Sequence, residues 1–343
     1  MKLQKENINN SMIWLNDMRI LAALAIIVIH VTQFFIKIPT TTDSPSWWIA
    51  NFYLSLSSWG VPVFVMISGA LLLSPNKTYA TMSIFYKKRI NRLLLPLAFW
   101  TIFYLFWSFF KSQVTDVPFN FNTIFFNLLN GEPYYHMWYL YMVFGLYLVT
   151  PYLRKLVKHS TKYELLILSM ILMLMSIISV YTGADSQKSI IFIQKFPYYL
   201  GYFIAGHIIL NSKLEIATKY LIFLFIFFTF LTAIGKYYFQ INFYNNFSIT
   251  IILTSMTLMF LIKKIHHTIP INPELRKQLA SFSLGAYLIH PAVLGVIKKI
   301  NYFGLNLEYN VWIIIPFIVI ITTLVSLLIA YIFSKTPLLK KVI

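Results

Sequence analysis

The chain has 343 residues, of which 59% are hydrophobic and only 11% are charged, whereas a soluble domain carries about 25% charged residues. The net charge is +18, but the basic residues lie in short segments between long apolar runs, which is how membrane topology is encoded and which argues against a nucleic-acid partner. The chain contains no cysteine, which excludes disulfides, thiolate metal sites and a cysteine nucleophile.

Apolar runs long enough to cross a hydrocarbon core of about 30 Å follow one another along the chain. Ten such runs cover approximately residues 12–37, 47–73, 86–110, 134–153, 164–182, 194–210, 218–236, 244–262, 279–300 and 310–334. Since backbone polar groups cannot stay unpaired in lipid and the runs do not alternate as membrane strands do, they are predicted to be helices. We therefore predict an all-α integral membrane protein, a bundle of about ten transmembrane helices in one domain over residues 1–343, with its core at about 12–334.

The basic residues also predict an orientation. Most of the 28 Lys and Arg residues fall on one side of the membrane when the N-terminus is placed in the cytoplasm, as the positive-inside rule requires. An even number of spans then puts both termini in the cytoplasm. The first apolar run lacks a small-residue cleavage site and is expected to remain as a helix. The segments between runs are short, so any chemistry is expected inside the bundle or at its mouths.

The first run contains Arg19 near its cytoplasmic end and His30 toward its outer half. At about 100° per residue the two share one helix face and lie about 16 Å apart along the axis. Ionisable groups at membrane depth usually face a polar cavity. Two alternatives stay open: Arg19 as a snorkelling anchor paired with Asp17, and His30 as a neutral histidine hydrogen-bonded between helices.

The third run opens with Arg89 and Arg92, three residues apart and therefore on one helix face. A helix N-terminus attracts anions, and guanidinium groups bind phosphate in bidentate geometry, as a nucleotide phosphate would require. The alternative is binding of lipid headgroups at the inner leaflet.

The fourth run opens at the outer interface with His136 inside an aromatic segment. Tyrosine and tryptophan are common in such belts, but the histidine is not explained by one. Glu132 precedes His136 by four residues, and the intervening Pro133 leaves a shared helix face open.

The ninth run contains His290 followed by Pro291. Proline frees a carbonyl one turn back and is expected to kink the helix at mid-membrane, so a histidine there is expected to face away from lipid. A structural hydrogen bond between helices stays open as the alternative role of His290. Ser68, followed by Gly69 in the second run, is interpreted as close helix packing rather than as a nucleophile. No helix carries histidine and carboxylate pairs with metal-ligand spacing, so no metal site is predicted.

Taken in order, these segments resemble the membrane acyltransferase family 3. The resemblance rests on WLNDMR followed by His30, on Arg89 and Arg92, and on the segments at 63–69, 135–139 and 283–291. The pattern is similar to the branches that include the enterobacterial common antigen O-acetyltransferase and the poly-N-acetylglucosamine O-succinyltransferase. One departure is Ile20, where many members have glycine.

The resemblance implies an O-acyltransferase of the bacterial plasma membrane. Its donor would be cytoplasmic acyl-CoA, usually acetyl-CoA, and its acceptor a hydroxyl of a cell-envelope polysaccharide or glycan precursor, in contact with membrane lipids and with the polysaccharide synthesis machinery. Arg19, Arg89 and Arg92 would hold the CoA phosphates. His30 would be the general base, because the pKa of histidine is near neutral, with His136 and His290 as candidates for acceptor positioning or a second proton relay.

Two other functions compete with this one. An exporter of polysaccharide or of a small molecule would need a continuous polar path, but intramembrane charge is sparse, and no internal repeat is visible of the kind that transporters often show. A membrane scaffold or sensor would consume no acyl-CoA. The choice between acetyl and succinyl as the transferred group stays open.

Overall fold

The structure is a computed structural model, and it describes residues 2–37, 44–74, 81–114, 119–182, 195–239, 243–302 and 310–343. The described residues form helices and no strands, as predicted. The α-helices are α1 (Lys2–Lys37), α2 (Pro45–Ser57), α3 (Gly60–Leu72), α4 (Met82–Val114), α5 (Phe121–Leu129), α6 (Trp138–His159), α7 (Lys162–Tyr181), α8 (Leu200–Asn211), α9 (Thr218–Phe239), α10 (Ile249–Ile265), α11 (Pro273–Tyr302) and α12 (Val311–Lys335). Short 3-10 helices are η3 (Phe196–Tyr199), η4 (His266–Thr268) and η5 (Leu339–Val342).

Among the described residues, eight segments are long and apolar enough to cross a membrane, so the chain is a multi-pass membrane protein. They are Ile13–Ile36, Pro45–Leu72, Met82–Val114, Lys162–Tyr181, Thr218–Phe239, Ile249–Thr268, Pro273–Lys299 and Val311–Lys335. The two other expected spans correspond to α6 and to η3 with α8. The 12 residues of α8 extend about 18 Å, less than the hydrocarbon core, and the second half of α6 carries Arg154, Lys155 and Lys158. The count of ten and the cytoplasmic placement of the termini remain predictions.

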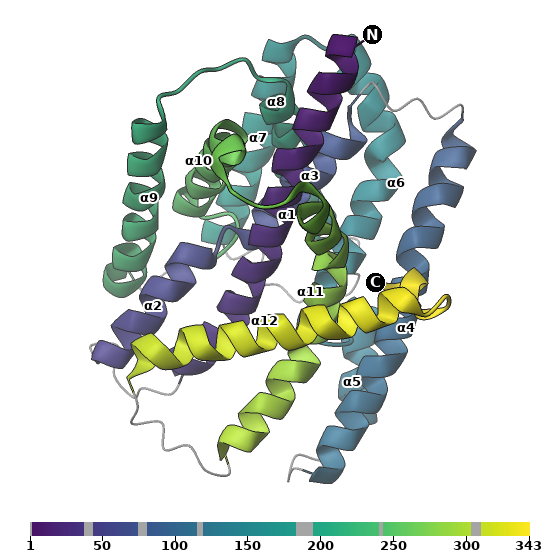
Figure 1. Cartoon of the computed structure of the whole chain (residues 1–343), viewed down its shortest axis with the longest axis vertical. Coiled ribbons are helices and arrows are strands. Elements are labelled where there is room, and N and C mark those ends of the chain that lie inside the picture. Colours follow the sequence, from purple (N-terminus) through teal and green to yellow (C-terminus); the bar gives the residue numbers. More distant parts are fainter. Residues whose placement is uncertain are drawn as a thin grey trace.

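Helix α1 is the centre of the bundle. It contacts α2, α3, α10, α11 and α12, and in Figure 1 it runs through the middle of the molecule while α12 crosses in front of it. Its buried side chains include Trp14, Met18, Ala22 and Ile26, all within the main hydrophobic core. The buried face of α1 is therefore surrounded by other helices rather than by lipid.

The segment expected as one helix at 47–73 is broken between α2 and α3. Pro62 has no backbone N–H and cannot continue the hydrogen-bond ladder of α2, so a new helix begins at Gly60 with Pro62 in its first turn. A Cβ at Gly60 would lie 3.0 Å from the Ile26 side chain of α1, which shows how closely the break packs on α1. The break leaves Ser58 at the end of α2, on the wall of the site described below.

Helices α3 and α8 pack backbone to backbone through two glycines. A Cβ at Gly69 would lie 1.7 Å from the Phe203 carbonyl oxygen, and a Cβ at Gly206 would lie 1.8 Å from the Met66 carbonyl oxygen. Small residues allow this approach of membrane helices. The Ser68 hydroxyl donates within its own helix, to the Phe64 carbonyl at 3.0 Å.

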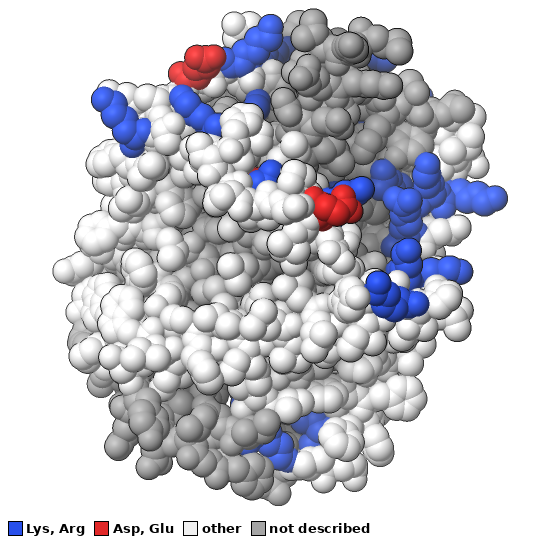
Figure 2. All heavy atoms as spheres, in the orientation of Figure 1, with Lys and Arg blue, Asp and Glu red and all other residues white. Residues whose placement is uncertain are grey.

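Charge is distributed unevenly over the surface. On the face shown in Figure 2, most Lys and Arg side chains gather in the upper half, above a broad band without charge. Large apolar side chains on α4, α7, α9 and α12 are exposed; on α9 they include Ile222, Phe223, Ile226, Phe227 and Phe230. An uncharged, apolar belt of this kind is what a bilayer requires.

Candidate active site

Three histidines that are far apart in the sequence meet inside the bundle. His30 on α1 stacks on His290 of α11 with ring centroids 5.2 Å apart. His136, which lies just before α6, meets His290 edge to face at 5.7 Å. The structure thus brings together the three histidines that the sequence singled out.

The three histidines differ in exposure. His30 is half-buried and lines a cavity, whereas His136 is 1% exposed and His290 is fully buried. Three of their ring nitrogens make no hydrogen bond among the described residues: Nδ1 and Nε2 of His136, and Nε2 of His290. Buried polar nitrogens are normally satisfied, so these three atoms have hydrogen-bonding capacity to offer a bound molecule or water.

Pro291 determines how His290 is held. Since proline has no N–H, the Tyr287 carbonyl four residues earlier lacks its helical partner. The Nδ1 of His290 lies 2.6 Å from that carbonyl oxygen. A carbonyl only accepts hydrogen bonds, so Nδ1 carries the proton and Nε2 holds the lone pair in the neutral ring. Helix α11 nevertheless continues through Pro291 to Tyr302.

Two tyrosines, one on α11 and one on α4, hold the segment before α6 in place. The Tyr287 hydroxyl donates to the backbone carbonyl of His136. Tyr104 of α4 donates to the Leu288 carbonyl at 2.6 Å, stacks on Tyr134 at 4.4 Å and meets the His136 ring edge to face at 4.9 Å. Tyr104 stands in an aromatic run of α4 without any distinguishing motif, so the sequence alone does not single it out.

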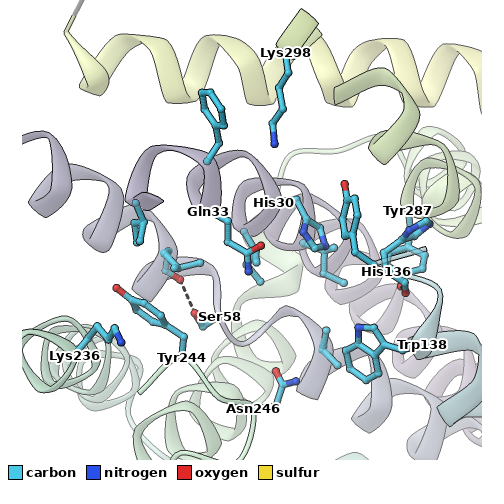
Figure 3. A pocket seen from close by; sticks show the side chains of 17 residues that line it. His30, Gln33, Ser58, His136, Trp138, Lys236, Tyr244, Asn246, Tyr287 and Lys298 are labelled. Carbon is cyan, nitrogen blue, oxygen red and sulfur yellow. Dashed lines mark hydrogen bonds between the residues drawn. The ribbon is translucent and has the colours of Figure 1, made fainter. Parts of the chain in front are cut away.

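The cavity beside His30 has a volume of about 770 Å³. Figure 3 shows its lining side chains, which come from α1, α2, α3, α6, α9 and α11, from the link between α2 and α3, and from the segments before α6 and α10. The polar and aromatic lining residues are His30, Gln33, Phe34, Ser58, Tyr135, His136, Trp138, Lys236, Tyr244, Asn246, Tyr287 and Lys298. Gln33 follows His30 by one helical turn, a spacing that would have suggested it from the sequence. The polar and aromatic lining residues outside α1 come from separate segments, and only the fold brings these segments together.

One wall of the cavity is built by a small hydrogen-bond network. The Tyr244 hydroxyl donates to the Asn51 side-chain oxygen at 2.6 Å, and the Asn51 amide donates to the Ala233 carbonyl at 3.0 Å. Burial raises the pKa of the Tyr244 phenol, which keeps it a neutral donor. The network ties α2, α9 and the segment before α10 together around the cavity.

The arginines lie toward the other end of α1. Arg19 interacts electrostatically with Tyr139 and Tyr147 of α6 and with Arg89 of α4, so two of the three predicted phosphate-binding residues lie within electrostatic range of each other. Arg92 is exposed one turn further along α4.

A file of tyrosines leads from the arginines to the histidines. Tyr139 lies near Arg19 and meets Tyr287 with ring centroids 5.5 Å apart. Tyr287 in turn meets His136 at 5.4 Å. Hydroxyl-bearing side chains therefore connect the two ends of the candidate site through the bundle.

Two acidic residues have partners other than those considered from the sequence. Asp17 does not serve Arg19: it forms a buried ion pair with Arg276 of α11, 2.8 Å between Oδ1 and Nε. Glu132 pairs with Lys195 rather than with His136. Nothing local in the sequence shows that the side chain of Arg276 is buried in the bundle, where it is 6% exposed.

Within the described ranges no group of three or more His, Cys, Asp or Glu side chains is arranged to hold a metal ion.

One of the comparisons with known proteins finds a match. The sequence model of an acyltransferase domain matches residues 12–331. No curated protein and no solved structure matches the chain. The matched range contains all six candidate residues, from Arg19 to His290.

Proposed function

We propose, since this chain belongs to the acyltransferase 3 family of membrane acyltransferases, that it transfers an acetyl group from cytoplasmic acetyl-CoA to a hydroxyl of a bacterial cell-envelope glycan. The observation that carries the proposal is the half-buried His30 on the wall of a large cavity, with two buried histidines behind it. Its setting would be the bacterial plasma membrane, beside the polysaccharide synthesis machinery.

The acceptor is proposed to occupy the cavity. Trp138 and the half-exposed Tyr135 offer aromatic faces, and Gln33 and Asn246 offer hydrogen bonds. Binding sites for small polar molecules combine such apolar walls with a few polar groups that fix orientation. A pyranose ring, with an apolar face and hydroxyls at its edge, has the matching chemistry.

The donor is proposed to enter from the arginine end. Arg19 and Arg89, which lie within electrostatic range of each other, would hold the CoA phosphates, with the exposed Arg92 available for a further phosphate. The pantetheine arm would follow the file of Tyr139 and Tyr287 and bring the thioester to His30. The ring contacts along this file support such a route, and the pantetheine arm has the linear shape that a narrow route requires.

His30 would act as a general base. It would take the proton from the acceptor hydroxyl while the hydroxyl oxygen attacks the thioester carbonyl carbon. The carbon–sulfur bond then breaks, and the leaving thiolate takes the proton back from the imidazolium as free CoA. His136 and His290, with nitrogens that make no hydrogen bond among the described residues, would position the acceptor or relay a second proton.

The test is acyl transfer by the purified protein in proteoliposomes, with labelled acetyl-CoA or succinyl-CoA and a panel of envelope sugars. Label on a sugar establishes the enzyme and its donor. Binding of CoA without transfer would reject the sugars tested as acceptors. Movement of a glycan across the membrane, with neither CoA binding nor transfer, would reject the proposal in favour of an exporter.

A further inference from the structure

A second cavity adjoins the one beside His30. Its volume is about 260 Å³, against about 770 Å³ for the first. Trp138, Tyr244 and Asn246 line both cavities, so at these residues the two spaces are a single side chain apart. In Figure 3 the three side chains lie along the lower side of the first cavity, below His30. A molecule held beside His30 therefore has a second space within reach, past a wall that both cavities share.

Hydrogen bonds from three other elements hold the shared wall in place. The Asn246 amide donates to the Tyr199 hydroxyl of η3 at 2.8 Å, and the Asn246 backbone carbonyl accepts from the Tyr202 hydroxyl of α8. Tyr244 donates to the buried Asn51 of α2. Side chains that are already fixed lose little conformational entropy when a ligand binds to them. The shared wall is therefore preorganised as a binding surface.

The second cavity offers polar groups whose charges balance. Glu132 and Lys195 both line it and form an ion pair, and their side chains remain 40% and 32% exposed. A carboxylate can accept several hydrogen bonds and an ammonium group can donate three, so a single ion pair leaves capacity for a ligand on both sides. The pair adds no net charge to the wall.

Aromatic side chains complete the lining of the second cavity. Tyr198 and Phe247 line it beside the shared Trp138, and the Tyr198 and Phe247 ring centroids are 5.9 Å apart. Apolar walls with a few polar groups that fix orientation are typical of sites for small polar molecules. The second cavity thus repeats, at a smaller size, the chemistry of the cavity beside His30.

A neutral sugar ring matches this lining better than a lipid chain or an anion does. Its apolar face can pack on the aromatic rings, and its hydroxyls can both donate to Glu132 and accept from Lys195. A lipid chain would bring no polar atom to the ion pair and would remove the pair from water without compensation. An anion would meet a carboxylate as well as an ammonium group.

We infer that the acceptor is an extended glycan, and that the second cavity binds a sugar next to the one that is acylated beside His30. The inference rests on the proposed function, because it names the class of acceptor for that same site. The bound neighbouring sugar holds the reacting sugar in position, so its binding free energy raises kcat/KM for long acceptors over short ones. Tyr198 and Glu132 are specificity-determining residues in this arrangement, and they select for chain length.

The experiment measures how transfer and binding depend on acceptor length, with the full-length protein in nanodiscs of phosphatidylcholine. The probes are the methyl glycosides of cello-, malto- and chito-oligosaccharides, each from the monosaccharide to the tetrasaccharide. Transfer is measured as kcat/KM with labelled acetyl-CoA, and binding is measured by titration calorimetry without a donor. The readout is the ratio between long and short acceptors, from which a general loss of active protein cancels.

Two residues that line the second cavity and not the first are changed, each with a matched control. Tyr198→Leu removes an aromatic face, Tyr198→Phe keeps it, and Glu132→Gln removes the carboxylate. The controls are Tyr181→Leu and Glu215→Gln. Tyr181 is exposed at the end of α7, Glu215 is exposed between α8 and α9, and both lie outside the lining of the two cavities.

We expect kcat/KM for the longest acceptor of one series to exceed that for its monosaccharide at least tenfold, a factor that corresponds to about 1.4 kcal/mol. The rise should level off after the first added sugars, because the second cavity is small. Tyr198→Leu and Glu132→Gln should each lower the ratio severalfold, and Tyr198→Phe should keep most of it. The two control variants should show the wild-type ratio.

Equal kcat/KM at all lengths, no binding of any member of the panel, or a length dependence that survives both Tyr198→Leu and Glu132→Gln would overturn the inference. Transfer to monosaccharides alone would do the same and leave the proposed acyltransferase function intact. Length-dependent binding that Tyr198→Leu removes, with no acetyl transfer to any acceptor, would instead keep the second sugar site and count against the proposed function.

Discussion

Replacing His30 by glutamine tests the proposed base directly. Glutamine keeps a polar side chain on the cavity wall but cannot accept a proton at neutral pH. A positioned general base contributes about 10²- to 10⁴-fold to a rate, which corresponds to about 3–5.5 kcal/mol in the activation free energy. We therefore expect kcat for acetyl transfer to fall by that factor.

The structure also sets what the change should cost in stability. His30 makes two ring contacts, with His290 at 5.2 Å and with Tyr135 at 4.9 Å. Aromatic pairs contribute about 0.5–1.5 kcal/mol each beyond their buried area, so the loss should stay at about 1–3 kcal/mol and leave the variant folded in the membrane. The KM for acetyl-CoA should change little, because Arg19 and Arg89 lie toward the other end of the helix bundle.

The assay is steady-state transfer in proteoliposomes, with protein amount and thermal unfolding checked in the same preparation. His159→Gln is the matched control, since His159 is exposed at the end of α6 and should behave as wild type. Near-normal transfer by His30→Gln would refute the assignment. If His136→Gln or His290→Gln removed transfer while His30→Gln did not, the base would be one of the buried histidines.

Three further changes test other parts of the structure. Arg89→Ala should raise the KM for acetyl-CoA about tenfold. The KM for a donor that lacks the nucleotide phosphates, such as acetyl-pantetheine, should not change. An equal rise in KM with both donors would rule out a phosphate contact. Gly206→Val should destabilise the protein by well over 1 kcal/mol, because its Cβ would overlap the Met66 carbonyl, and an unchanged thermal unfolding midpoint would show that α3 and α8 are not packed this way. Asp17→Asn should lower the free energy of unfolding by about 3–5 kcal/mol, because it leaves Arg276 buried without its counter-ion. The double variant Asp17→Leu with Arg276→Met should recover much of that stability. If the double variant recovers none, the ion pair has a role beyond balancing its own charges.

The membrane character of this chain was readable from the sequence because it depends on local properties. Length and hydropathy of a run decide whether it can cross a bilayer, and the helix is the form that satisfies its backbone there. The same local reasoning placed Arg19 and His30 on one face of α1 and found that Pro291 frees a carbonyl. It did not foresee the break at Pro62, where one expected helix became α2 and α3, because a proline early in a helix and a proline that ends one have the same local pattern.

Only the tertiary structure decided which of these faces meet. His30, His136 and His290 each looked like an isolated polar residue with a structural alternative, and their convergence depends on how α1, α11 and the segment before α6 pack. The same holds for Asp17 and Arg276, whose ion pair joins two helices that are far apart in the chain. Helix periodicity specifies which residues share a face, but the partner of that face is chosen by side-chain packing between helices that are distant in the chain.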